Sequence, residues 1–245
     1  MNSEIENLLI NNGATLVGFA NIEGSYNPAD INPPLSEDSQ TEFFEIPQYP
    51  KGIAIAISIP QSVIRGINNA PTPDYYDTYI SLNNKLDTLA IMCSEYIESK
   101  GHHAFPQTVS TTKEYGIFRT IMPHKTVAVK AGLGFIGKSA LFVTKQYGSA
   151  IRLTSVLTDA PLNCGNPTTQ SLCGNCFECT NACPANAISG RLWSPEINRD
   201  DFFNAMACRL KAREIAAKTL NKKITLCGKC IEVCPYTQRY IDATK

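Results

Sequence analysis

The pattern of apolar and polar positions in the first 160 residues predicts helices that alternate with short strands. An apolar face within residues 3–11 predicts a helix that opens on the S-x-x-E pair of Ser3 and Glu6 and ends at Gly13. The run GIAIAISIP (52–60) is short, apolar and closed by proline, which is typical of a buried strand. Further strands are predicted at ATLVGFA (14–20), HHAFPQ (102–107) and IRLTSVLTD (151–159).

The clearest helix signal lies between residues 72 and 101. Thr72 is a suitable N-cap, Pro73 a suitable first helical residue, and Gly101 follows the last apolar position. Apolar residues recur every three or four positions, so one face of this helix should lie on a core. These positions are Tyr75, Tyr79, Leu82, Leu86, Leu89, Cys93 and Ile97.

The amino-acid composition of the chain changes in two places, at residues 21–50 and after Ala160. Residues 21–50 hold six acidic side chains, no basic one and five prolines, and predict an irregular surface excursion within the first domain. HKTVAVKA (124–131) fits a strand or a helix. We therefore expect an α/β domain over residues 1–160 and a second, small domain over residues 161–245, rich in Cys, Gly, Pro and Asn.

Charge and composition narrow the classes of partner. The chain has 22 basic and 22 acidic side chains, so no overall basic field attracts nucleic acid, although residues 161–245 carry 11 basic against 7 acidic groups. No apolar run is long enough to span a bilayer, and the first residues do not resemble a signal peptide. A cytoplasmic protein without membrane contact is expected.

The cysteines carry the strongest chemical signal. Cys173, Cys176, Cys179 and Cys183-Pro184 give the spacing C-x2-C-x2-C-x3-C-P, and CGKCIEVCP supplies Cys227, Cys230 and Cys234 before a second proline. In two-cluster ferredoxins the cysteine before proline binds the other cluster. The spacing thus predicts one [4Fe–4S] cluster on Cys173, Cys176, Cys179 and Cys234, and a second on Cys183, Cys227 and Cys230 that lacks one ligand.

Cys208, in the predicted helix 200–220, is the candidate for the missing ligand, with an ordinary core cysteine as the alternative. Cys164 is not expected to be a cluster ligand, because no ligand position remains for it. Disulfides are not expected in a cytoplasmic chain, and zinc would leave the three-cysteine spacing and the Cys-Pro steps unexplained.

The stretch AGLGFIGKSALF (131–142) matches two nucleotide-binding patterns. Gly132, Gly134 and Gly137 spell G-x-G-x-x-G, while Gly132, Gly137, Lys138 and Ser139 spell the phosphate-loop pattern. The flanks agree only in part, because the segment after Gly137 is short for a helix and TSVLTD is too polar for a buried parallel strand. The glycines indicate a close backbone approach to another segment or to a flat or phosphate-bearing ligand.

The order of these motifs resembles the epoxyqueuosine reductase family and, more distantly, the reductive dehalogenases. The resemblance rests on KAGLGFIGKSALFVTKQYGSAIRLTSVLTDAPL, the two cysteine motifs and the helix with Cys208, and covers about residues 50–240. It implies a nitroreductase-like α/β layer followed by a ferredoxin-like module with two [4Fe–4S] clusters. It also implies a cobalamin along Gly132, Gly134, Gly137 and Lys138, reduced through the clusters.

One departure from the family bears on the substrate. Family members carry a catalytic Asp in a segment like V-D-S-A-P-V-L-E-K, whereas the corresponding stretch YGIFRTIMPHK (115–125) has no Asp. The chain also stops soon after the second motif, without the extra segment of longer members. The missing Asp and the lack of a strong basic field together disfavour reduction of epoxyqueuosine in tRNA. Tyr115, Arg119 and His124 are the candidates for a proton donor, with ordinary structural roles as the alternative.

Three hypotheses follow. The first is a cytoplasmic oxidoreductase in which an external low-potential donor, two clusters and a cobalamin reduce a small organic substrate. The second is an electron-transfer protein that serves a redox partner, such as a corrinoid protein, and has no substrate of its own. The third, an ATP-driven activator of electron transfer, rests on the phosphate-loop match at Lys138.

Overall fold

The chain is built from two compact units, each assembled from separate stretches. The computed structural model describes residues 1–26, 48–68, 70–114, 116 and 118–243. Unit 1 comprises Met1–Ile57, Asn83–Leu133 and Leu153–Thr168, and unit 2 comprises Ser58–Leu82, Gly134–Arg152 and Thr169–Lys245. Residues 134–152, which the sequence groups with the first domain, thus belong to the same unit as the cysteine motifs. Most of the predicted excursion at 21–50 lies outside the described residues.

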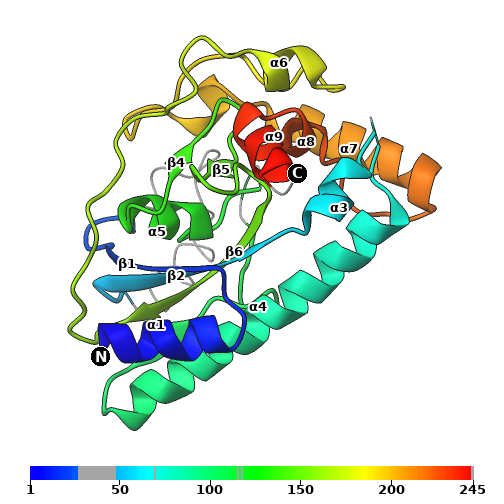
Figure 1. The fold of residues 1–245 in the computed structure, drawn as a ribbon. Coiled ribbons are helices and arrows are strands. Elements are labelled where there is room, and N and C mark those ends of the chain that lie inside the picture. Colours follow the sequence, from blue (N-terminus) through cyan, green and yellow to red (C-terminus); the bar gives the residue numbers. More distant parts are fainter. Residues whose placement is uncertain (27–47, 69, 115, 117, 244–245) are drawn as a thin grey trace. The chain divides into compact units, whose positions relative to one another are not determined.

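Unit 1 contains a four-stranded sheet, drawn in Figure 1. Its order is β1-β2-β6-β3, with β1 at Leu16–Asn21, β2 at Lys51–Ser58, β3 at Ala104–Pro106 and β6 at Ile151–Thr158. β1 and β2 are antiparallel, with Leu16 opposite Ala56, and β3 and β6 are antiparallel, with Ala104 opposite Thr158. All four predicted strands are present, and the mixed α/β fold is confirmed.

β6 is buried despite its polar sequence. Thr154, Ser155 and Thr158 are all within the core. The Thr154 hydroxyl donates to the Gln107 carbonyl at 2.8 Å, and the Thr158 hydroxyl donates to the His103 carbonyl at 2.7 Å. The polarity of TSVLTD therefore does not prevent burial, because its hydroxyls are hydrogen-bonded inside the sheet.

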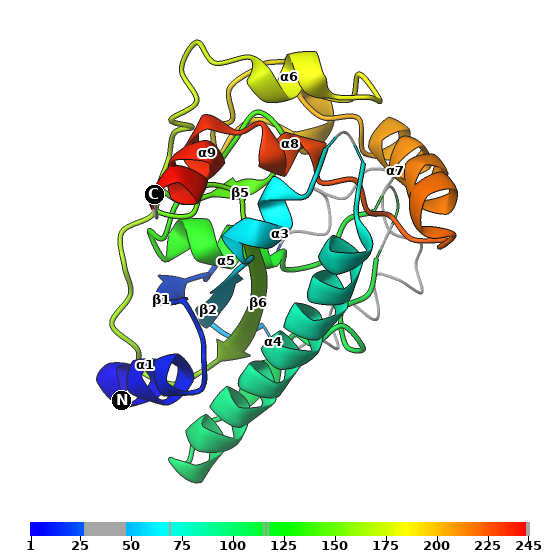
Figure 2. The same cartoon turned by 45° about the vertical axis from the view of Figure 1, so that its right-hand side comes forward.

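Helices cover both faces of this sheet, as Figure 1 and the turned view in Figure 2 show. α1 (Asn2–Asn11) and the later part of α4 (Pro73–Ser99) lie on one face, and α5 (His124–Lys130) lies on the other. HKTVAVKA is therefore a helix. The predicted capping box of α1 is wrong: the helix starts earlier, at Asn2, with Met1 as its N-cap and no side-chain cap. The Met1 amino group instead forms an ion pair with Glu4 at 3.0 Å.

α4 (Pro73–Ser99) begins and ends as its sequence predicts. The Thr72 hydroxyl accepts a hydrogen bond from the Tyr75 amide at 3.2 Å, and Gly101 has a φ of +83° beyond the last turn. The apolar face of α4 contributes residues to the cores of both units. Its positions up to Leu82 belong to unit 2, and those from Leu86 onward belong to unit 1.

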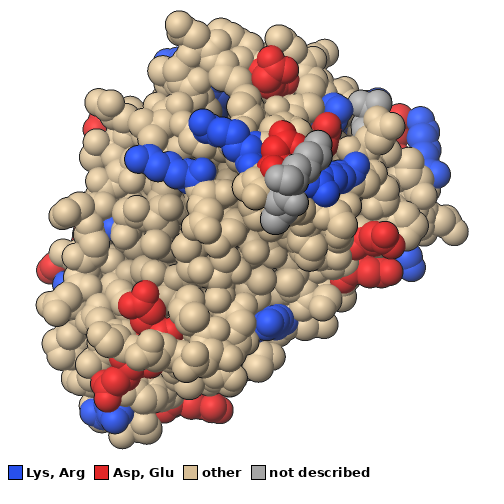
Figure 3. Space-filling view, in the orientation of Figure 1, with Lys and Arg blue, Asp and Glu red and all other residues tan. Residues whose placement is uncertain are grey.

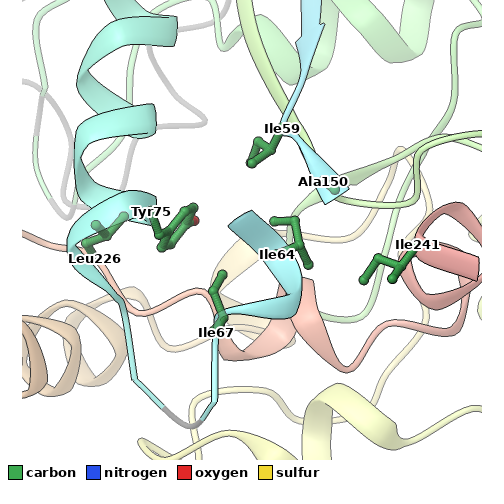
Figure 4. Close-up of a cluster of buried hydrophobic side chains, with 7 residues drawn as sticks. All are labelled: Ile59, Ile64, Ile67, Tyr75, Ala150, Leu226 and Ile241. Atoms are coloured by element: carbon green, nitrogen blue, oxygen red, sulfur yellow. The ribbon is translucent and has the colours of Figure 1, made fainter. Parts of the chain in front are cut away.

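Unit 2 combines short elements around an apolar core. The elements are α3 (Gln61–Arg65), β4 (Phe135–Ile136), β5 (Phe142–Val143), α6 (Glu178–Ala182), the 3-10 turn η2 (Arg199–Asp201), α7 (Ala205–Leu220), α8 (Lys229–Glu232) and α9 (Pro235–Asp242). Figure 4 shows one core cluster, which joins segments far apart in the sequence. Its members are Ile59, Ile64, Ile67, Tyr75, Ala150, Leu226 and Ile241.

One face of the molecule is drawn with its charged side chains in Figure 3. On the face drawn in Figure 3, the described lysines and arginines are scattered among acidic side chains and do not merge into one basic field. A search of the described part of the chain also finds no helix with the length and hydropathy needed to cross a bilayer.

Candidate metal centre and glycine loop

The first cysteine motif is a turn that leads into α6. The Cys176 amide donates to the Cys173 carbonyl at 3.0 Å, and Gly174 between them has a φ of +49°. Cys179 lies in α6, and Cys183 is the residue at which this helix ends. Cys183, extended before Pro184, leaves the direction of the helix, as the predicted crossover requires.

The second motif uses two short helices. Gly228, with a φ of +87°, precedes α8, which carries Cys230, and Cys234 is the N-cap of α9 with Pro235 as its first residue. A Cβ on Gly228 would approach the Tyr75 ring to 2.8 Å and Ile67 to 2.9 Å. Glycine is needed here because the turn is left-handed and lies against the core shown in Figure 4.

Cys208 lies one turn into α7. Asn204 caps this helix, because its side-chain oxygen accepts from the Ala207 amide at 2.9 Å. Residues 200–204 are not part of the α-helix, so the predicted helix 200–220 is shorter than expected at its start.

Neighbouring cysteines and burial together raise the pKa values of several thiols in these motifs. Burial, followed by Cys173, Cys234 and Cys176, raises the pKa of the Cys179 thiol to about 11. Burial, followed by Cys183 and Cys227, raises the pKa of the Cys208 thiol to about 11. Burial also raises the pKa of Cys230 well above its usual value, with contributions from Cys227, Cys208, Cys179 and Cys183. Cys208 thus lies near Cys183 and Cys227, and the division of the thiols into two ligand sets stays a prediction.

Among the described residues, no three His, Cys, Asp or Glu side chains are grouped so that they could share one metal ion. A zinc site would require four ligands within about 2.3 Å of one centre. A [4Fe–4S] cluster is a larger inorganic core that is held by four thiolates.

The glycine loop lies against protein at each glycine. A Cβ on Gly132, whose φ is +75°, would stand 2.6 Å from the Asn166 carbonyl oxygen within unit 1. On Gly134 it would stand 2.3 Å from the Val143 carbonyl oxygen within unit 2. Residues 138–141 after Gly137 form turns that lead into β5 rather than a helix. Both nucleotide-binding patterns need a helix at that point, so the loop does not form either site.

Lys138 is directed to the first cysteine motif. Its side chain is 2% exposed, and its Nζ donates to the Cys176 carbonyl at 2.8 Å. The same Nζ lies 3.8 Å from the centre of the Phe177 ring. A Cβ on the preceding Gly137 would lie 3.5 Å from the Cys173 Sγ. The end of the glycine loop therefore contacts the turn that carries the first two cysteines.

The three candidate proton donors differ in what the structure shows of their environments. Tyr115 lies outside the described residues, and Arg119 is half-buried. His124 is the first residue of α5, and its Nδ1 is 2.9 Å from the buried Ser155 hydroxyl, which also lies 2.6 Å from the Gln107 Nε2. The sequence analysis missed Ser155 and Gln107, because only the sheet brings them to the histidine.

Gln107 also borders an open pocket within unit 1. The pocket is lined by Phe105, Gln107, Thr111, Thr112, Lys113, Thr120, Ile121, Met122 and Leu157.

Sequence comparisons decide between the possible relationships. Residues 172–237 match the family of 4Fe-4S double cluster binding domains. The epoxyqueuosine reductase of Listeria monocytogenes is 33% identical over 119 residues, which are 46% of this chain and 29% of that protein. The predicted resemblance to epoxyqueuosine reductases is confirmed. The Bacillus subtilis epoxyqueuosine reductase is 28% identical over 164 residues, 66% of this chain and 38% of its own length. The matched regions thus span well under half of these relatives.

Solved structures share the fold. The epoxyqueuosine reductase of Streptococcus thermophilus superimposes with a TM-score of 0.63 at 20% identity, over 97% of this chain and 66% of that one. The catabolic reductive dehalogenase NpRdhA gives a TM-score of 0.68 at 16% identity, over 95% of this chain and 31% of that one. Among the other structures that share the fold, one epoxyqueuosine reductase is bound to a modified tRNA stem loop, and one reductive dehalogenase suggests a mechanism for B12-dependent dehalogenation.

Proposed function

We propose that this protein is an iron–sulfur oxidoreductase whose two [4Fe–4S] clusters transfer single electrons from an external low-potential donor. Cys173, Cys176, Cys179 and Cys234 would hold the first cluster, and Cys183, Cys208, Cys227 and Cys230 the second. The observation that carries the proposal is the match of residues 172–237 to a double cluster domain, a range that contains all eight of these cysteines. Bound clusters would supply one-electron storage at low potential.

The two groups lie next to each other. Cys230 of the second group acts electrostatically on neighbours that include Cys179 of the first. Cys183 ends the same helix that carries Cys179 but belongs to the other group. This adjacency supports a relay in which each cluster can accept an electron from the other.

A small organic substrate is proposed in preference to tRNA. The stretch YGIFRTIMPHK (115–125) contains no Asp. The solved Bacillus subtilis enzyme, by contrast, has an aspartate on a catalytic loop. Turnover of an epoxyqueuosine-modified tRNA stem loop by this chain would overturn the proposed substrate class.

His124 is the proposed proton donor. The Gln107 amide nitrogen donates to the Ser155 oxygen, so the one Ser155 proton is directed to the His124 Nδ1. A neutral His124 then carries its own proton on Nε2, where it can be given to a substrate. Ser155 and Gln107 orient the ring and hold its tautomer.

Cobalamin is the further group that the resemblance implies, and when bound it would supply a strongly nucleophilic cobalt. The residues predicted to line it fit poorly. Lys138 is bonded to Cys176, and the Cβ positions of the three glycines are filled by protein. We therefore derive no step through cobalamin.

One anaerobic experiment tests the proposal. The protein is reconstituted with iron and sulfide and titrated with cob(II)alamin, and absorbance and electron paramagnetic resonance are recorded. Two reducible clusters without cobalamin binding are the result expected from the poor fit at the glycine loop, and saturable binding of one cobalamin per chain would overturn that conclusion. A chain that cannot assemble two clusters would overturn the proposal.

The second candidate function is an electron-transfer protein without its own substrate. The observation that favours it is Lys138, whose side chain serves the cluster region instead of a ligand site. Two intact clusters that pass electrons to a redox protein but reduce no small organic substrate would select this function over the reductase. A redox protein, such as a corrinoid protein, would then be the partner.

A further inference from the structure

Lys138 is a buried cation beside the first cysteine motif. At 2% exposure it has almost no contact with water, and its ammonium donates to the carbonyl of Cys176, one of the proposed ligands of the first cluster. A lysine is seldom buried unless its charge is compensated. The described partners of this ammonium are a carbonyl oxygen and an aromatic face.

Phe177 covers this ammonium. Its ring centre lies 3.8 Å from Nζ, although 47% of the Phe177 residue is exposed. Gly190, whose φ is +86°, brings its backbone so close that a Cβ there would stand 2.7 Å from the ring. Phe177 is thus held between Gly190 and Lys138, and it separates the charge from solvent.

Such a charge acts most strongly on a neighbouring anion. Adding one electron to a cluster held by four thiolates makes the whole group more negative, with no bond formed or broken. A fixed positive charge therefore stabilises the reduced state more than the oxidised state, and low local polarity strengthens the effect. Net charge, hydrogen bonds and solvent exposure are the properties through which a protein sets the potential of a cluster.

We propose that Lys138 is a positioning residue of the first cluster: through Cys176 and under Phe177, its charge raises the reduction potential of that cluster above that of an uncharged variant. The inference rests on the proposed cluster ligands. It assigns the end of the glycine loop, Gly137-Lys138, to electron transfer instead of phosphate or corrinoid binding.

Three substitutions separate charge from hydrogen bonding. Lys138→Met removes both, Lys138→Gln keeps a donor for the Cys176 carbonyl but removes the charge, and Lys138→Arg keeps both. The matched control is Lys145→Met, which removes an exposed lysine from the same stretch of unit 2. Iron content and a potentiometric titration followed by electron paramagnetic resonance are measured for each reconstituted protein.

In Lys138→Met and Lys138→Gln, we expect the reduction potential of one cluster to become more negative while the other cluster keeps its potential. In Lys138→Arg and Lys145→Met, both potentials should stay near those of the unmodified protein. Unchanged potentials in both uncharged variants with full iron content would overturn this inference alone. A normal potential in Lys138→Gln with a shift only in Lys138→Met would also overturn it, because the hydrogen bond would then be sufficient. Failure of the unmodified chain to hold two clusters would overturn the proposed function as well.

Phe177→Ala gives an independent measurement if the Lys138 variants assemble poorly. It leaves the ammonium in place but admits water, which screens the charge. The reduction potential of the same cluster should become more negative, but by a smaller amount. In the double variant, Lys138→Gln should then change this potential less than it does alone. An upward shift, or full additivity of the two substitutions, would contradict the shielded-charge arrangement.

Discussion

The backbone of Gly148 lies directly on that of Thr237, so a Cβ on Gly148 would stand 2.2 Å from the Thr237 nitrogen. Thr237 is fully buried, and its hydroxyl accepts a hydrogen bond from the Ser149 amide at 3.1 Å. Through this contact the segment after β5 supports the start of α9, where Cys234 is the N-cap. A proposed cluster ligand therefore depends on a glycine more than 80 residues away in the sequence.

Gly148→Ala should destabilise unit 2 and weaken the first cluster. The φ of +58° costs a non-glycine residue about 1–2 kcal/mol, and the backbone clash adds about 1–3 kcal/mol. Gly101→Ala is the control, because Gly101 has a φ of +83° but nothing within 4 Å of its Cβ position. Urea unfolding and iron content measure both effects, and equal losses in the two variants would show that the contact with Thr237 is unimportant.

Cys208→Ala should remove one cluster and leave the other. The protein should retain about half of its iron after reconstitution, because the second group would hold only three thiols. Cys164→Ala is the matched control: Cys164 is also half-buried, and its described contact is a weak one with the Leu162 carbonyl at 3.5 Å. Full iron content in Cys208→Ala, or equal loss in both variants, would remove Cys208 from the ligand set.

Ser155→Ala should lower the free energy of unfolding by about 1–3 kcal/mol, because it leaves buried polar atoms of Gln107 and His124 without this partner. Without the Ser155 hydroxyl, the neutral His124 ring should carry its proton on either nitrogen. Nitrogen NMR of the imidazole would detect this change. Ser99→Ala, on the exposed end of α4, should change stability by less than about 0.5 kcal/mol. An unchanged imidazole spectrum in Ser155→Ala would contradict the proposed orientation of His124.

Cys93 should resist alkylation while the protein is folded. Burial raises the pKa of its thiol to about 12, so hardly any reactive thiolate exists at pH 8. Mass spectrometry after treatment with iodoacetamide should find Cys93 unmodified under conditions that label the half-buried Cys164. Rapid labelling of Cys93 without unfolding would show that the core of unit 1 opens locally.

The raised pKa of Cys93 also makes the stability of the protein depend on pH in a defined direction. The folded pKa lies above the unfolded value of about 8.5, so the contribution of a protonated Cys93 is complete below about pH 8.5 and is lost as the pH rises toward 12. Cys93→Ala should therefore show a smaller decline in unfolding free energy over this alkaline range than the unmodified protein. An identical decline in both proteins would contradict the assignment.

Local patterns were sufficient for the ends of α4, for the four strands of the sheet and for the double cluster motif. Thr72, Pro73 and Gly101 predict the ends of α4 correctly, because a cap acts on neighbouring residues of the same helix. The spacing of Cys173, Cys176 and Cys179 indicates iron–sulfur clusters for a similar reason, since the three residues lie on one turn and the short helix that follows it. The S-x-x-E pattern failed at α1, because the helix already includes Asn2 and Met1 takes the N-cap position.

Tertiary structure decided what depends on residues distant in the chain. It brought Cys208 to Cys183 and Cys227, and turned Lys138 from a presumed ligand contact to the Cys176 carbonyl. It also joined residues 134–152 to the cysteine motifs and divided α4 between two cores. Capping, turn chemistry and motif spacing act within a few residues and can be read from order alone. The partner of a buried charge or thiol is set by which segments pack together, and that becomes definite only in the folded chain.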